Sequence, residues 1–121
     1  MKYLVMDEFD AAHQLPQYDG KCANMHGHTW AVKVLFSVLV LNIDASGIGI
    51  DFKVLKNIVH HSLPDHQLLN DILPRPSAEL LAQYIALTIR RRLMSDGLET
   101  QIRLDSVGLW ESKDACVIVE E

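Results

Sequence analysis

Histidines at two places in the sequence have a spacing that suits metal binding. His26 and His28 are separated by one residue, and His13 precedes them at the end of an apolar segment. In an extended strand, residues i and i+2 point to the same side, so both imidazoles of the pair can reach one point. If the two segments pair as a hairpin, His13 can join them. Three neutral imidazoles with an open fourth position are typical of a catalytic zinc site.

The same histidines also have a simpler interpretation. An isolated His-x-His pair is more often a surface feature than a pair of ligands, and a third histidine strengthens the metal hypothesis only modestly. The two cysteines, Cys22 and Cys116, do not form the closely spaced pair that would complete a structural zinc site. We expect both to remain thiols in a reducing cytoplasm, since they allow at most one disulfide.

Cys22 lies between His13 and His26, so its thiol could sit close to the metal, which would favour the thiolate. A free cysteine is otherwise more often an inert buried residue. Cys116 lies inside a terminal apolar segment and fits that second description.

Two further positions carry groups that could act on a ligand. Asp65 precedes His66, and a carboxylate beside an imidazole can orient the ring and favour its protonated form. Without a ligand, both are simply solvated polar groups. Glu111 follows Trp110 near the end of a predicted strand, where it would be an edge carboxylate unless a ligand requires it.

Two apolar segments early in the chain, Lys2–Asp10 and Thr29–Leu41, predict β-strands because they are rich in valine, leucine and aromatic residues. One face of the second strand carries Trp30, Val32, Val34, Phe36, Val38 and Val40, and the other carries Leu35, Leu39 and Leu41. A strand that is apolar on both sides is normally covered on both sides. In so short a chain, we therefore expect assembly with further subunits.

Two helices are predicted in the middle of the chain. Asp51 can cap the first, which carries Phe52, Leu55, Ile58 and Val59 at helical spacing, and Ser77 can cap the second, with Leu81, Ile85 and Ile89 inward. Between them, the proline-rich segment Leu63–Pro76 predicts an irregular connection. Asp96 and Gly97 end the second helix, and Gln101–Trp110 and Ala115–Val119 predict two further strands. The order ββααββ favours an α+β fold with an antiparallel sheet.

The length of 121 residues predicts a single domain, residues 1–121. A formal net charge of −5 does not suit a protein that binds nucleic acid by neutralising phosphates. Acidic residues interrupt the N-terminal segment, so we expect no export signal. The most apolar run, Trp30 to Ile43, contains Lys33, Ser37 and Asn42 and is too short to span a bilayer. We therefore expect a cytoplasmic protein that binds neither membranes nor nucleic acid.

Several short motifs, taken in order, cover nearly the whole chain. They are residues 9–16 (FDAAHQLP), 21–28 (KCANMHGH), 47–52 (GIGIDF), 65–70 (DHQLLN), 75–79 (RPSAE) and 110–112 (WES). In these motifs the sequence resembles the 6-pyruvoyltetrahydropterin synthase family. Three residues separate Cys22 from His26, which favours the 6-carboxytetrahydropterin synthase branch of queuosine biosynthesis over the animal pyruvoyl enzymes, whose interval is longer.

The resemblance implies the tunnelling fold (T-fold), in which ββααββ subunits with two helices on one face join their sheets into a barrel. It further implies a homo-oligomer, a trimer or hexamer, with pockets between subunits. For the site, it assigns Zn²⁺ binding to His13, His26 and His28, proton transfer to Cys22, Asp65 and His66, and binding of the pterin substrate to Glu111, Ser77 and Glu79.

The activity that the resemblance implies is a zinc-dependent carbon–carbon lyase. It would convert 7,8-dihydroneopterin triphosphate to 6-carboxy-5,6,7,8-tetrahydropterin, acetaldehyde and triphosphate. One alternative is a 6-pyruvoyltetrahydropterin synthase, which eliminates triphosphate without releasing acetaldehyde. Another is a noncatalytic pterin-binding or metal-binding module, which would have no need of Cys22, Asp65 and His66.

The sequence departs from the family pattern at Pro64, Arg75 and Ser77, where leucine, asparagine and threonine are usual. None of these changes removes a proposed catalytic group. Pro64 restricts the residue before it and could reposition Asp65.

Overall fold

The long apolar segments form the first two strands of the sheet in the computed structural model, which describes residues 1–120. Strand β1 (Lys2–His13) pairs antiparallel with β2 (His26–Val38), in a register that runs from Lys2 opposite Ser37 to His13 opposite His26. The hairpin therefore brings His13 beside His26, as the sequence predicted.

The last residue of the predicted domain, Glu121, lies outside the described residues.

The sheet has five strands in the order β3-β1-β2-β4-β5. Strands β4 (Ile102–Ser112) and β5 (Ala115–Glu120) extend it antiparallel on one side, and β3 (Gln67–Leu68) pairs parallel with β1 on the other. This short parallel strand is a correction to the predicted order ββααββ. It lies inside the segment that was expected to be irregular, together with a short 3₁₀ helix, η2 (Leu69–Asp71).

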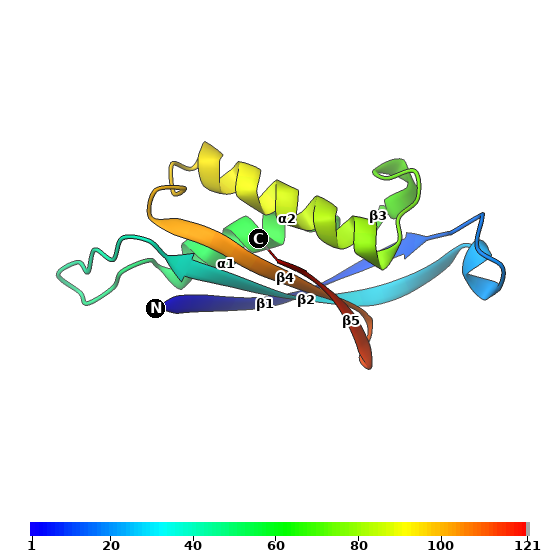
Figure 1. Cartoon of the computed structure of the whole chain (residues 1–121), viewed down its shortest axis with the longest axis horizontal. Coiled ribbons are helices and arrows are strands. Elements are labelled where there is room, and N and C mark those ends of the chain that lie inside the picture. Colours follow the sequence, from blue (N-terminus) through cyan, green and yellow to red (C-terminus); the bar gives the residue numbers. More distant parts are fainter. Residues whose placement is uncertain (121) are drawn as a thin grey trace.

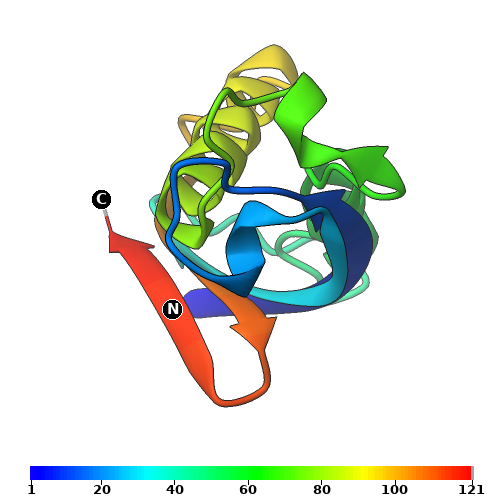
Figure 2. The same cartoon turned by 90° about the vertical axis from the view of Figure 1, so that its right-hand side faces the viewer.

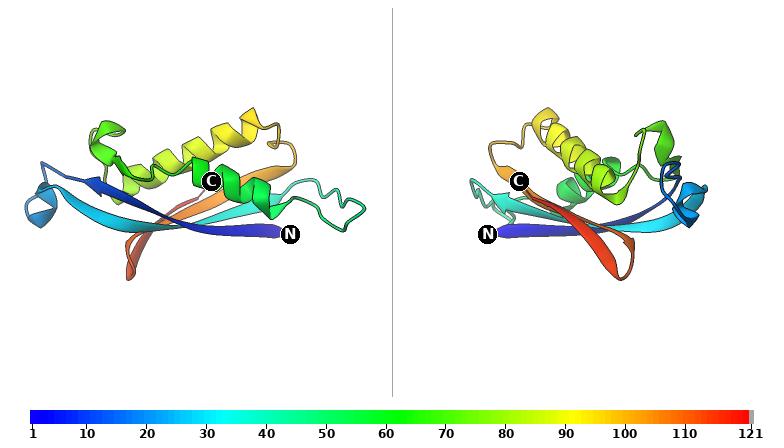
Figure 3. Two further views of the ribbon diagram at one scale, coloured as in Figure 1. Left: turned by 180° about the vertical axis from the view of Figure 1, so that it is seen from behind. Right: turned by 45° about the vertical axis from the view of Figure 1, so that its right-hand side comes forward.

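Two α-helices pack against the same face of the sheet (Figures 1 and 3). Helix α1 (Phe52–His61) begins after Asp51, whose side chain accepts a hydrogen bond from the backbone N–H of Lys53. Helix α2 (Ala78–Ser95) begins after Ser77, whose hydroxyl accepts from the N–H of Leu80. Both predicted caps are confirmed, and each satisfies a backbone donor that the first helical turn leaves without a partner.

The hydrophobic core lies between these helices and the sheet. On β2, alternate residues from Trp30 to Phe36 point toward the helices and are buried, which is the period expected of a strand. The helices contribute the apolar residues that the sequence placed inward: Leu55, Ile58 and Val59 from α1, and Leu81, Ile85 and Ile89 from α2.

Three details differ from the predictions. Strand β2 ends at Val38, so Leu39, Val40 and Leu41 lie in the following loop and are exposed. Phe52, expected to point inward, is 58% exposed and touches the edge of the Tyr3 ring. The second apolar face of β2 has no helix over it, so the cover predicted for both sides is present on one side only within this chain.

Two loops extend past opposite ends of the sheet (Figure 1). The loop of residues 14–25 between β1 and β2 contains a 3₁₀ turn, η1 (Lys21–Ala23), and lies toward the viewer in Figure 2. The strand ends beneath it bring together the residues that the sequence singled out. No helix within residues 1–120 is both long enough and apolar enough to cross a bilayer.

Candidate active site

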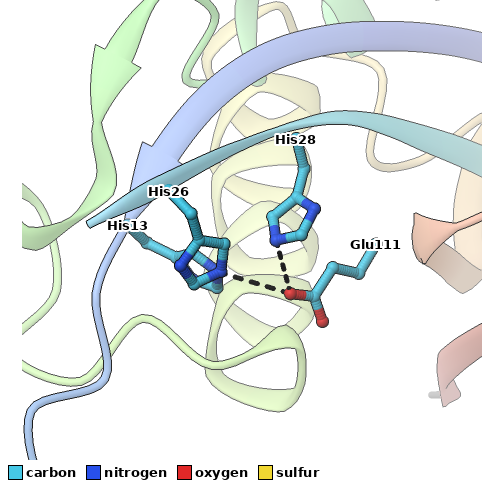
Figure 4. A group of neighbouring side chains, drawn as sticks. All are labelled: His13, His26, His28 and Glu111. Atoms are coloured by element: carbon cyan, nitrogen blue, oxygen red, sulfur yellow. Dashed lines mark hydrogen bonds and ion pairs between the residues drawn. The ribbon is translucent and has the colours of Figure 1, made fainter. Parts of the chain in front are cut away.

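Four metal-binding side chains gather at the end of the sheet below the loop of residues 14–25. They are His13, His26, His28 and Glu111, and their ligand atoms all lie within 4.8 Å of one another (Figure 4). His13 continues the inward-facing side of β1, His26 and His28 continue that of β2, and Glu111 continues that of β4. The cluster is therefore a polar extension of the core face.

The hydrogen bonds of His13 and His26 determine which ring nitrogens carry protons. His13 Nδ1 lies 2.7 Å from the backbone oxygen of Pro76, and His26 Nδ1 lies 2.7 Å from that of Asn24. A carbonyl oxygen only accepts hydrogen bonds, so both Nδ1 atoms must donate. In the neutral rings, both Nε2 atoms then carry lone pairs, and they face each other at 2.9 Å. Two lone pairs at this distance repel unless a cation lies between them.

His28 adds a third nitrogen to the same place. Its Nε2 atom is buried and lies 2.8 Å from Glu111 Oε1. This contact does not have the geometry of a hydrogen bond, and Nε2 has no hydrogen-bond partner among the described residues. Burial lowers the pKa of His28, and His26 and His13 lower it further, although Glu111 acts in the opposite direction. A neutral imidazole is the form that binds a metal. The three histidines therefore fit a metal ion that accepts nitrogen ligands.

The indole of Trp30 forms the floor under these rings. It is fully buried, and its ring centroid lies 5.2 Å from that of His13 and 5.3 Å from that of His28, both edge to face. Its Nε1 donates to the backbone oxygen of Ala11 at 3.3 Å. A large buried ring restricts the rotamers of its neighbours, so Trp30 helps to hold two of the histidines.

Contacts with the segment before α2 fix the end of β1. Pro76, which accepts from His13, is buried immediately before the cap of the helix. Asn70 in η2 accepts from the Gln14 N–H at 2.9 Å and donates to the Gln14 oxygen at 3.0 Å. The His13 ring is thus held by Pro76, and the backbone of the next residue, Gln14, is held by Asn70. Such partners set the orientation and tautomer of metal-binding histidines.

Asp65 and His66 form a second group beside the first strand. Their side chains contact each other, with His66 Nδ1 3.0 Å from Asp65 Oδ2. The hydrogen bond from the Asp10 N–H lowers the pKa of Asp65, and the pairing with His66 lowers it further. Asp65 is therefore a carboxylate at neutral pH, which suits a role in orienting the imidazole. Pro64 does not separate the pair.

A cavity of about 570 Å³ is lined by residues of β1, β2 and β3 and by His66, and its β2 residues include His28. A second cavity of about 200 Å³ lies between the start of α2 and the β4–β5 hairpin, and its lining includes Glu79, Glu111 and Cys116. Two of the three predicted substrate-binding residues thus share one cavity. The third, Ser77, is the cap of the helix that borders it.

Two cysteines and a further histidine that the sequence drew attention to lie outside the four-residue cluster. Cys22 is half-buried in η1 and is not part of the four-residue cluster. Cys116 is half-buried on β5 opposite Trp110. His60 contacts Asp7 at 3.0 Å, away from the cluster.

Sequence reasoning missed three features of this region. Glu111 was expected to bind pterin but not to touch His28. The carbonyl oxygen of Pro76 has no sequence signal, since every residue has one. Asp10 was not singled out, although it belongs with Asp65 and His66 to a group whose ligand atoms lie within 4.8 Å of one another. Its place in the FDAAH motif, three residues before His13, was the available signal.

These features define an α+β domain with a three-histidine cluster at one end of its sheet that could hold a metal ion. Residues 3–121 match the family model described as 6-pyruvoyl tetrahydropterin synthase. The chain belongs to this family of pterin synthases, and the single subunit has the α+β tunnelling fold that the resemblance implied.

Curated relatives from bacteria and archaea carry two different names. A 6-carboxy-5,6,7,8-tetrahydropterin synthase of Synechocystis is 40% identical over 85 residues, which are 64% of this chain and 65% of that protein. The Haemophilus influenzae protein of the same name is 31% identical over 86% of this chain and 87% of its own length. A dihydroneopterin monophosphate aldolase of Pyrococcus furiosus is 31% identical over 93% of this chain and 90% of its own length.

Solved structures agree on the fold. The 6-pyruvoyl tetrahydropterin synthase of Caenorhabditis elegans superposes with a TM-score of 0.75 at 22% identity, over 100% of this chain and 95% of that one. A Plasmodium vivax 6-pyruvoyltetrahydropterin synthase variant gives 0.71 at 19% identity, over 100% and 97%.

Proposed function

We propose that this protein is a zinc-dependent 6-carboxy-5,6,7,8-tetrahydropterin synthase of queuosine biosynthesis. The observation that carries the proposal is the convergence of three imidazoles, two of them with facing Nε2 lone pairs. The names of the Synechocystis and Haemophilus relatives support the choice of reaction.

His13, His26 and His28 would hold the metal, and nitrogen ligands suit zinc. Zinc, when bound, lowers the pKa of a substrate hydroxyl and stabilises negative charge on oxygen. The backbone oxygens of Pro76 and Asn24 keep His13 and His26 in the tautomer that offers Nε2. These two hydrogen bonds would orient the rings of His13 and His26 before a metal binds.

Glu111 would anchor the pterin ring. A pterin presents a ring N–H beside an exocyclic amine, and one carboxylate can accept from both. Glu79 lines the same cavity as Glu111, and Ser77 caps the helix that borders it, so both would contact the ring from the start of α2. An acidic cavity that favours N–H donors is the chemistry that a pterin requires.

Cys22, Asp65 and His66 would move protons during the reaction. Asp65 stays ionised and orients His66, so the imidazole is the member of this pair that gains or loses the proton. Cys22 is not a member of the metal cluster, which leaves its thiol available as a second proton carrier. We further propose that the protein acts in the cytoplasm as a homo-oligomer, a trimer or hexamer.

A second candidate is an aldolase acting on dihydroneopterin monophosphate. The Pyrococcus relative of that name matches nearly the full length of this chain. Both reactions break the side chain between its first two carbons, so the same metal centre and ring anchor would serve either. They differ in the phosphate carried by the substrate and in the aldehyde released.

Product analysis separates the candidates. The zinc-loaded protein is incubated with dihydroneopterin triphosphate and, separately, with the monophosphate. Acetaldehyde together with a 6-carboxy pterin from the triphosphate supports the proposal. A hydroxymethyl pterin with a phosphorylated two-carbon aldehyde from the monophosphate identifies the aldolase. A pyruvoyl product without acetaldehyde identifies a 6-pyruvoyltetrahydropterin synthase, and binding without turnover identifies a noncatalytic module.

A further inference from the structure

Residue Asp10 in β1 holds the loop that carries Asp65 and His66. Its N–H donates to Asp65 Oδ1 at 2.9 Å, and its carbonyl oxygen accepts from the His66 N–H at 2.7 Å. The next residue of β1, Ala11, then pairs with Gln67 in the short parallel strand. One strand residue therefore bonds both members of the pair.

The side chain of Asp10 is oriented by the neighbouring strand. Thr29 lies directly opposite Asp10 in the β1–β2 register, and its hydroxyl donates to Asp10 Oδ1 at 2.6 Å. A hydrogen bond to a carboxylate is stronger than one between neutral groups, so it favours one rotamer of Asp10. Thr29 follows His28, whose side chain points to the opposite face of the strand and into the metal cluster.

The ring of His66 is otherwise weakly held. Its side chain is 78% exposed, and its backbone has a positive φ of 57°, a conformation that non-glycine residues adopt infrequently. Asp65 constrains the ring on its Nδ1 side, and the carboxylate of Asp10 is the third member of the same compact group. Asp10, Thr29, His28 and His66 all line the cavity of about 570 Å³.

We propose that Asp10 and Thr29 are positioning residues for the Asp65–His66 pair. The Thr29 hydroxyl fixes the carboxylate of Asp10, and this second negative charge beside Asp65 limits the orientations that the ring of His66 can take. The catalytic role of this arrangement rests on the proposed proton transfer by His66, whereas the orientation of the ring is a property of the resting protein.

Substitutions that differ by one group test the proposal. Thr29→Val keeps the shape of the side chain but removes the hydroxyl, Thr29→Ser keeps the hydroxyl, and Asp10→Asn removes the charge. Thr88→Val is the matched control, because it removes a hydroxyl that bonds only to the Tyr84 oxygen within α2. Circular dichroism and metal content confirm that each variant is folded and loaded.

The first measurement is nitrogen NMR of the histidine rings without substrate. In the wild-type protein, we expect one tautomer of His66, with the proton on Nδ1 facing Asp65. Thr29→Val and Asp10→Asn should shift the signals toward the mixture of a free histidine, whereas Thr29→Ser and Thr88→Val should not. Unchanged His66 signals in both Thr29→Val and Asp10→Asn would overturn the proposal, whichever pterin reaction the protein performs.

The second measurement is steady-state turnover. Removing a constraint on a proton-transfer group should lower kcat by roughly tenfold in Thr29→Val, which is less than the about 10²- to 10⁴-fold contribution of such a group, because His66 itself remains. KM should change little, and Thr29→Ser should restore kcat. A wild-type kcat in Thr29→Val, or an equal loss in Thr88→Val, would contradict a positioning role. If the wild-type protein gives none of the expected products, the proposed function fails while the NMR result still decides this proposal.

Discussion

His13 and His26 stand opposite each other in the last registered pair of β1 and β2, with their Nε2 atoms 2.9 Å apart. Each ring donates from Nδ1 to a backbone oxygen on its other side, which leaves both Nε2 lone pairs directed at one point. The strand pairing that builds the core therefore also brings the candidate metal ligands together.

Replacing His26 or His28 with alanine should abolish stable metal binding. Loss of an outer partner of a metal ligand already lowers affinity by about 10- to 100-fold, so loss of a ligand should exceed 100-fold. Metal analysis of the purified variants measures this, with about one zinc per chain expected in the wild type. His61→Ala is the control, since that side chain lies outside the cluster. Full zinc retention after replacing both His26 and His28 would exclude the site.

Replacing Cys22 with alanine should lower turnover by about 10²- to 10⁴-fold while metal content and fold stay unchanged, because the thiol is proposed to transfer a proton. Cys116→Ala should remain active, as its side chain lies on β5 opposite Trp110. If the Cys22 variant loses zinc instead and recovers activity when metal is added, the thiol has a different role.

Replacing Glu111 with glutamine should weaken pterin binding more than metal binding. The amide loses one acceptor and the negative charge, and hydrogen bonds to charged groups contribute roughly 1.5–3 kcal/mol, or about a 10- to 150-fold change in Kd. Calorimetry with a pterin ligand gives the affinity, and zinc content is measured on the same sample. Zinc loss at unchanged pterin affinity would make Glu111 a metal ligand, as its 2.8 Å contact with His28 allows.

Replacing Met6 with glutamate should dissociate the proposed homo-oligomer. Met6 is 69% exposed and points away from the buried side of β1, to the sheet face that no helix covers. Removing a charge from water there is costly even though Lys33 lies opposite Met6 in the strand register. Met94 on α2 is 65% exposed, so Met94→Glu is a matched control that should assemble normally. Light scattering should give a trimer or hexamer for the wild type and smaller species for Met6→Glu. A fully active wild-type monomer would contradict the proposed assembly.

Replacing Asp105 with asparagine should destabilise the protein at neutral pH and not in acid. Its carboxylate accepts from Lys2 Nζ at 2.7 Å and from the Ser37 hydroxyl, and these bonds lower the pKa of Asp105. A lowered pKa means that the stabilisation is present above the unfolded-state value and disappears as pH falls through the folded-state value. We expect a loss of about 1 kcal/mol at neutral pH, since the pair is partly screened.

Urea denaturation at neutral pH and at about pH 2 measures this difference. Asp19→Asn, in the exposed loop before η1, controls for the change in net charge. Equal stability of the Asp105 variant and the wild type at neutral pH would show that the contacts with Lys2 and Ser37 contribute nothing.

Local patterns in the sequence were enough to predict most of the helices and strands and part of the site. The alternation along β2 places His26 and His28 on the same side as Trp30, because residues two apart in a strand share a face. The caps at Asp51 and Ser77 could be located because their side chains satisfy backbone donors in the next turn. These are local effects, so a short stretch of sequence is enough to predict them.

Contacts between distant segments were decided only by the tertiary structure. Glu111 reaches His28 because β4 pairs with β2 in one particular register, and His13 meets the Pro76 oxygen because the start of α2 packs over the end of β1. The loop with Asp65 and His66 is attached to Asp10 through backbone groups that every residue has. Register and backbone pairing across 55 or more residues leave no local pattern in the sequence, and they decide which functional groups meet.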